Sequence, residues 1–170
     1  MKTTTGPLAL HFFATLTTAG PLPASQAPPA PSATPAQAPS AGDVIPAFDA
    51  KGVDGSPHRV EFKKGSRTVL VFFLSGCPSC HKMIPEWNRA FGRKPAGLDM
   101  VGVLMDQEPP GFFATIQVDF PVVRSPGRQF MDSLKVQRAP LTLRVAAGGK
   151  VEDVALGVID PIRLGEFFRP

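Results

Sequence analysis

An unbroken apolar run at residues 69–74 is the strongest pattern in the chain. It contains Val, Leu and Phe without a polar interruption, which is typical of a strand covered on both faces of a sheet. A second short apolar segment, Leu98–Met105, predicts a neighbouring strand. Between the two, apolar residues recur at spacings of one, three and four and predict a helix from Cys77 to about Phe91. The central part of the chain therefore predicts a strand–helix–strand unit.

The flanking segments predict further strands and helices. An apolar start at 44–48 and turn-rich residues at 49–57 lead to a weak strand at 59–62. In the second half of the chain we expect helices at 111–117 and 128–134, with an extended piece at 118–123 between them. A hairpin of strands 141–145 and 151–156 turns at Gly148-Gly149, and a last helix at 162–168 follows Pro161. Strands alternate with helices first and a hairpin follows. This order predicts an α/β fold, with a central mixed sheet flanked by helices and an N-terminal β-hairpin extension.

The N-terminal region has a different character. Lys2 precedes a short, weak apolar segment and then small residues, so residues 1–24 predict a secretory signal peptide, with cleavage after Ala19 or Ala27. An unprocessed membrane anchor and a disordered tail are the alternatives. Residues 25–42 are rich in Pro and Ala and predict a disordered linker. We expect the folded domain to span residues 43–170, outside the cytoplasm or in the periplasm.

Charge and hydropathy argue against nucleic-acid binding and against a strong membrane span. The net charge is +4, and no basic run exceeds the pair Lys63-Lys64, so nucleic-acid binding has little support. No stretch of 18 apolar residues is present, so a strong membrane span is not predicted.

The two cysteines of the chain give the main chemical evidence. They form the run Cys77-Pro78-Ser79-Cys80, directly after the apolar strand and at the start of the predicted helix. A helix start offers unpaired N–H groups and a positive dipole end, which stabilise a thiolate. Thiol–disulfide exchange needs an exposed attacking thiolate and a second sulfur that resolves the mixed disulfide. We predict that Cys77 attacks, that Cys80 resolves, and that Pro78 and Ser79 tune the stability of the thiolate.

The cysteine pair has four other possible uses: a structural disulfide, a zinc site, haem c attachment and Cu(I) binding. A structural disulfide across two residues closes too small a loop to stabilise much. Zinc needs about four ligands, and two cysteines with three scattered histidines do not form a zinc pattern, so no metal and no cofactor are expected. Cys77-x-x-Cys80-His81 also matches the haem c attachment pattern, although a strand leads straight into it. A Cu(I) metallochaperone is the sharper alternative, because soft thiolates select Cu(I).

The strand and Cys-x-x-Cys, followed by Pro85 within the helix and by Ala139-Pro140 before a strand, resemble the thioredoxin fold. The opening 48–52 and the segment 101–123 are similar to the extracytoplasmic TlpA/ResA-type branch of that superfamily. The resemblance implies a cis Ala139-Pro140 bond whose peptide groups face Cys77 and bind the backbone of a substrate. It also implies a thiol–disulfide oxidoreductase that reduces disulfide-containing proteins, apocytochromes c for instance. Its electrons would come from a membrane thiol donor, with a membrane tether through the N-terminal segment.

The chain lacks one residue of the thioredoxin pattern, a buried acidic residue on the strand before the cysteines. Val71 stands where thioredoxin places a buried acid, six residues before the first cysteine. Glu86 is a candidate for the missing proton acceptor, with a solvated helix glutamate as the simpler interpretation. His81 is expected to point outward, where it either raises the local positive potential when protonated or is a solvated helix residue.

Overall fold

The computed structural model describes residues 1–3 and 38–170. Residues 4–24 of the predicted signal peptide and residues 25–37 of the predicted linker lie outside the described residues. Gly42 is already bonded to the folded domain, because its N–H donates to Val151 O at 2.8 Å. Among the described residues, no helix is long and apolar enough to cross a membrane.

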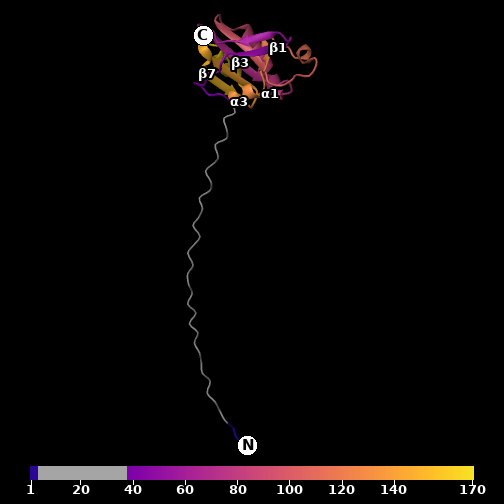
Figure 1. Cartoon of the computed structure of the whole chain (residues 1–170), viewed down its shortest axis with the longest axis vertical. Coiled ribbons are helices and arrows are strands. Elements are labelled where there is room, and N and C mark those ends of the chain that lie inside the picture. The colour runs from indigo at the N-terminus through magenta and orange to yellow at the C-terminus, as the bar shows by residue number, and fades with distance from the viewer. Residues whose placement is uncertain (4–37) are drawn as a thin grey trace. The chain divides into compact units, whose positions relative to one another are not determined.

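Seven strands of the described part form one mixed sheet, in the order β2-β1-β5-β4-β3-β6-β7. Figure 1 shows this domain, with β1, β3, β7, α1 and α3 labelled. The strands are β1 Phe48–Gly52, β2 Pro57–Val60, β3 Arg67–Phe73, β4 Leu98–Leu104, β5 Val122–Arg124, β6 Leu141–Val145 and β7 Val151–Leu156. The helices are α1 Pro78–Gly92, α2 Phe112–Thr115, α3 Arg128–Ser133 and α4 Pro161–Phe167, with a 3-10 turn, η1, at Ala147–Gly149. β3 pairs in parallel with β4 and antiparallel with β6, so it lies at the centre of a mixed sheet. The predicted fold class is confirmed.

The strand β3 supplies both hydrophobic cores, because alternate side chains of a strand point to opposite faces. Val69, Val71 and Phe73 pack with the buried residues of α1 and α4. Leu70 and Phe72 belong to the other core, which includes buried residues of β6 and α3. All five of these side chains are completely buried, as predicted from the unbroken apolar run. Helices therefore cover both faces of the sheet.

The N-terminal hairpin is present, but its strands begin earlier than predicted. Residues 48–52, interpreted mostly as a turn, form the strand β1, and the turn is confined to residues 53–56. Phe48 pairs with Val60, and these are the only fully buried positions of β1 and β2. A hairpin that buries one residue per strand leaves little alternation in the sequence, so its boundaries are hard to locate.

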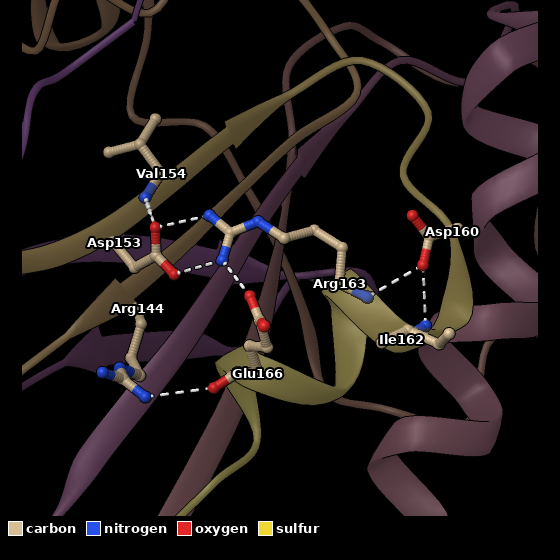
Figure 2. Close-up of polar contacts among 7 residues, drawn as sticks. All are labelled: Arg144, Asp153, Val154, Asp160, Ile162, Arg163 and Glu166. Carbon is tan, nitrogen blue, oxygen red and sulfur yellow. Dashed lines mark hydrogen bonds and ion pairs between the residues drawn. The ribbon is translucent and has the colours of Figure 1, made fainter.

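The C-terminal helix α4 is held to the sheet by a polar cluster on β6 and β7 (Figure 2). Arg163 of α4 donates to both carboxylate oxygens of Asp153 at 2.6 and 2.8 Å, and also to Glu166 at 2.7 Å. Arg144 donates to the carbonyl of Glu166 at 3.0 Å. The helix starts at Asp160, whose Oδ1 accepts the N–H groups of residues 162 and 163 at 2.9 Å each. These bonds fix the orientation of α4.

Candidate active site

Cys77 occupies the N-cap of α1, four residues beyond the end of β3. Its backbone is extended (φ −92°, ψ 111°), and its sulfur accepts a hydrogen bond from the N–H of Cys80 at 3.1 Å. Pro78 occupies the first turn of α1, where a missing N–H costs nothing. The helix start thus presents a donor to the half-buried sulfur of Cys77, as the sequence predicted.

Cys80 lies one turn further along α1, and its environment is very different. Its side chain is completely buried. Burial, together with the hydrogen bond with Cys77, raises the pKa of the Cys80 thiol to about 12, although a hydrogen bond from the backbone of Leu74 acts in the opposite direction. Both cysteines are free thiols. The pair therefore combines an accessible sulfur with a buried one that holds its proton strongly.

The Ala139-Pro140 peptide bond is cis, as the resemblance predicted. It brings the carbonyl of Ala139 to 4.0 Å from the sulfur of Cys77. The carbonyl of Pro140 accepts the N–H of Gly157 at 2.7 Å, which ties this loop to the residue that follows β7. Cys77 and Ala139, which are 62 positions apart in the sequence, are thus neighbours in the fold.

His81 does not point outward as predicted, nor is it a solvated helix residue. It is half-buried, and its Nε2 lies 2.6 Å from the carbonyl oxygen of Ser75. Since a carbonyl only accepts, Nε2 carries the proton. The imidazole ring packs 6.0 Å from the ring of Phe112 in α2. Sequence reasoning missed this because Phe112 belongs to a four-residue helix far along the chain.

Asp106 is the acidic residue that sequence reasoning missed. It follows β4 by two residues, and its carboxylate accepts the N–H of Ser75 at 2.9 and 3.1 Å and the Ser75 hydroxyl at 2.8 Å. Glu86, the predicted candidate, instead pairs with Arg89 on the surface of α1. A usable signal existed: β3 and β4 were both predicted, and the carboxyl ends of neighbouring parallel strands meet at one edge.

The arrangement gives the haem alternative no support. The Nε2 atom that would ligate iron is already bonded to Ser75, in the interior of the active-site turn. Among residues 38–170, no cluster of three or more His, Cys, Asp or Glu side chains is placed to hold a metal ion.

The fold and the dithiol define a thioredoxin-like thiol–disulfide oxidoreductase. Within that class the chain belongs to the Redoxin family, whose model matches residues 40–163. The chain is 27% identical over 124 residues to the thiol-disulfide oxidoreductase ResA of Bacillus subtilis, covering 71% of this chain and 69% of ResA.

Two solved structures give the same fold. The crystal structure of StoA from Bacillus subtilis superposes with a TM-score of 0.64 at 21% identity, over 75% of this chain and 100% of StoA. A protein from Chlorobium tepidum, provisionally named thiol:disulfide interchange protein DsbE, superposes with a TM-score of 0.67 at 26% identity, over 76% of this chain and 96% of its own. The predicted thioredoxin-like fold is confirmed.

Proposed function

We propose that this protein works outside the cytoplasm as a reductant of protein disulfides, with Cys77 as nucleophile and Cys80 as resolving thiol. The observation that carries the proposal is the asymmetry of the two thiols: Cys77 is half-buried at a helix start, and Cys80 is fully buried with a raised pKa. Thiol–disulfide exchange requires such an accessible attacking group and a protected second one.

The chemistry proceeds in two displacements. The thiolate of Cys77 attacks one sulfur of the substrate disulfide, forms a mixed disulfide and releases the first substrate thiolate. Cys80 then loses its proton and attacks the sulfur of Cys77, which releases the second substrate thiolate and leaves a Cys77–Cys80 disulfide. A membrane thiol donor restores the dithiol by the reverse exchange, at the cost of its own oxidation.

The substrate backbone is held beside Cys77 by the cis-proline loop. The carbonyl of Ala139 lies 4.0 Å from the Cys77 sulfur, so a substrate cysteine that reaches this sulfur also places its own peptide groups against residues 139 and 140. An extended substrate segment then adds to the loop as a strand would. This binding uses only main-chain groups and accepts many sequences around the substrate cysteine.

The extracytoplasmic location and the reducing direction rest on the N-terminal pattern and on the similarity to the ResA type. Residues 1–24 carry the pattern of a secretory leader, which also serves as a membrane tether if it is not removed. Apocytochromes c are then substrates of the expected kind. A reduction potential well below that of the glutathione pool supports a reductant, and a potential near that of a strong oxidant contradicts this part of the proposal.

Substitution of each cysteine tests the two roles. Cys77→Ser is expected to abolish insulin reduction, and Cys80→Ser is expected to accumulate a mixed disulfide through Cys77. Brief alkylation of the native, reduced protein at pH 7 is expected to modify Cys77 and leave Cys80 unmodified. Wild-type insulin reduction by the Cys77→Ser protein, or equally slow alkylation of both thiols, contradicts the assignment.

The copper-chaperone alternative is weaker on physical grounds. A Cu(I) site between the two sulfurs needs both as thiolates, and burial of Cys80 opposes its ionisation. Native mass spectrometry of the reduced protein with Cu(I) separates the two functions. Stable binding of one Cu(I) together with absent insulin reduction favours the chaperone.

A further inference from the structure

The carboxylate of Asp106 is fixed directly beneath the active-site turn. Both of its oxygens accept hydrogen bonds from Ser75, which stands two residues before Cys77. Ser75 is itself buried, and its carbonyl is bonded to His81 on the opposite side. The position of Asp106 is therefore set by the same turn that positions the two cysteines.

Adjacent backbone groups hold the Cys80 sulfur and the Asp106 carboxylate. The backbone of Leu74 hydrogen-bonds the sulfur of Cys80, and the N–H of the next residue, Ser75, bonds Asp106. The negative charge of Asp106 is accordingly one of the causes that raise the pKa of Cys80. Asp106 is therefore a carboxylate base whose charge reaches the Cys80 thiol.

Asp106 also lies on the wall of an open cavity of about 670 Å³. The cavity lies between α3 and the ends of β4 and β5. Its charged lining groups besides Asp106 are Arg124, Arg128 and Asp132. Arg124 is engaged by Glu108 and by the carbonyl of Gly52. Asp106 therefore borders a space that admits water, and its partner Ser75 directly follows the residue whose backbone bonds the buried thiol of Cys80.

We propose that Asp106 accepts the proton of Cys80 during resolution of the mixed disulfide and passes it to water in this cavity. This inference rests on the proposed roles of the two cysteines. The Sγ–H bond of Cys80 breaks as the proton moves to the Asp106 carboxylate. The sulfur's electron pair forms the bond to Cys77, and the substrate leaves as a thiolate. Water in the cavity then takes the proton from Asp106 and restores the carboxylate. Asp106 thereby takes the role of proton acceptor that Val71, which has no acidic group, cannot take.

The titratable groups near Asp106 decide how the rate of resolution by Cys80 depends on pH. Cys77 is already covalently bound in the mixed disulfide and does not titrate at that stage. His81 faces Asp106 only through the carbonyl of Ser75, and Arg128 and Asp132 of α3 face it across the cavity. A rate that depends on a carboxylate base is maintained at neutral pH, whereas a rate that depends on hydroxide rises tenfold per pH unit.

Reaction of the reduced full-length protein with the aromatic disulfide DTNB separates the two displacements. The first thionitrobenzoate is released at a rate proportional to the DTNB concentration, because Cys77 attacks the reagent. The second is released at a rate independent of that concentration, because Cys80 resolves the mixed disulfide. In Asp106→Asn we expect the second phase to slow about 100-fold at pH 7, the first to stay within about twofold, and the gap to close as the pH rises. Asp132→Asn, in the same cavity, is the matched control and is expected to behave as wild type.

Chemical rescue distinguishes a proton acceptor from a merely structural residue. In Asp106→Ala the cavity admits a small carboxylate, so acetate is expected to accelerate the second phase in proportion to its concentration without changing the first. If both variants fail to fold, Asp106→Glu keeps the carboxylate and is expected to slow the second phase more than the first. An unchanged second phase in Asp106→Asn, equal slowing of both phases, or no acetate rescue overturns the proposal. Loss of the concentration-dependent phase in Cys77→Ser is the separate test of the cysteine roles, and its persistence contradicts the proposed function instead.

Discussion

The indole Nε1 of Trp87 donates a hydrogen bond to Oγ1 of Thr142 at 3.3 Å. Both residues are buried, and they join the middle of α1 to the strand β6. Cys77 stands at the start of α1, and Pro140 immediately precedes β6. A buried polar contact, in addition to apolar packing, thus joins the helix that begins beside Cys77 to the strand that follows the cis-proline loop.

Removal of the Thr142 hydroxyl tests this contact. Thr142→Val keeps the shape of the side chain but leaves the buried indole N–H without a partner, and we expect it to lower the free energy of unfolding by about 1–3 kcal/mol. Urea denaturation of the reduced protein measures the effect. Thr142→Ser keeps the hydroxyl and is the matched control, since it loses only a methyl group. Equal stability of wild type and Thr142→Val shows that the contact contributes nothing.

A methyl group added at Gly102 is expected to destabilise the sheet. A Cβ there lies 2.7 Å from Phe120, 3.1 Å from Phe73 and 3.2 Å from Val122, all in packed side chains. We expect Gly102→Ala to cost about 1–3 kcal/mol, because the aromatic rings must shift.

Gly165→Ala is the control for this substitution. Gly165 lies within α4, and a Cβ at this position meets no atom within 4 Å. Alanine there is expected to stabilise the protein by about 0.5–1 kcal/mol through its helix propensity. Thermal and urea unfolding of the two variants should shift in opposite directions, and destabilisation of both contradicts the steric argument.

The pair of Asp153 and Arg163 in Figure 2 predicts a loss of stability in acid. Hydrogen bonds from Arg163 hold the pKa of Asp153 below its usual 3.8. As the pH falls through this range the unfolded chain takes up the proton first, so the stabilisation present above pH 4 is lost at lower pH. We expect Asp153→Asn to be about 1 kcal/mol less stable than wild type at pH 7 and equally stable near pH 2.

Asp49→Asn provides the comparison for Asp153→Asn. Asp49 also pairs with an arginine, Arg59, but its side chain is 78% exposed, so its removal is expected to change stability little at any pH. Urea denaturation from pH 2 to pH 7 measures both variants. If the difference in unfolding free energy between wild type and Asp153→Asn is the same at every pH, the charge of Asp153 is not the source of the stabilisation.

The raised pKa of Cys80 predicts a loss of stability in alkali, whereas the lowered pKa of Asp153 predicts a loss in acid. A thiol in the unfolded chain ionises near pH 8.5, whereas the folded thiol holds its proton to about 12. The stabilisation is therefore complete below pH 8 and is lost as the pH rises toward 12. Under reducing conditions we expect the stability of wild type relative to Cys80→Ala to fall by on the order of 2 kcal/mol between pH 8 and pH 11.

Cys77→Ala is the control in alkali. It keeps the buried thiol, and burial is the largest cause of the raised pKa, so most of the alkaline loss should remain. If the unfolding free energies of wild type and Cys80→Ala change in parallel between pH 8 and pH 11, the buried Cys80 thiol is not the cause of the alkaline loss of stability.

The elements near the dithiol were predictable because their signals are local. The apolar run of β3, the spacing in α1 and the motif Cys77-Pro78-Ser79-Cys80 each lie within a few residues. The boundaries of β1 and β2 were less accurate, since these strands bury one residue each. The short helix α2 was predicted too long, because four residues make little more than one helical turn and leave no repeating pattern that marks its ends.

By itself the sequence determined the α/β order of strands and helices and the identity of the two cysteines, because strand, turn and helix propensities act between neighbours. The loop at Ala139-Pro140 was placed beside Cys77 by the resemblance to the thioredoxin fold. The tertiary structure alone decided the surroundings of those cysteines: the depth at which Cys80 is buried, the contact of His81 with Ser75, and the approach of Asp106 from the next strand. These features arise where parallel strands end side by side. Burial and hydrogen bonding there depend on the packing of segments distant in the chain, which no local pattern records.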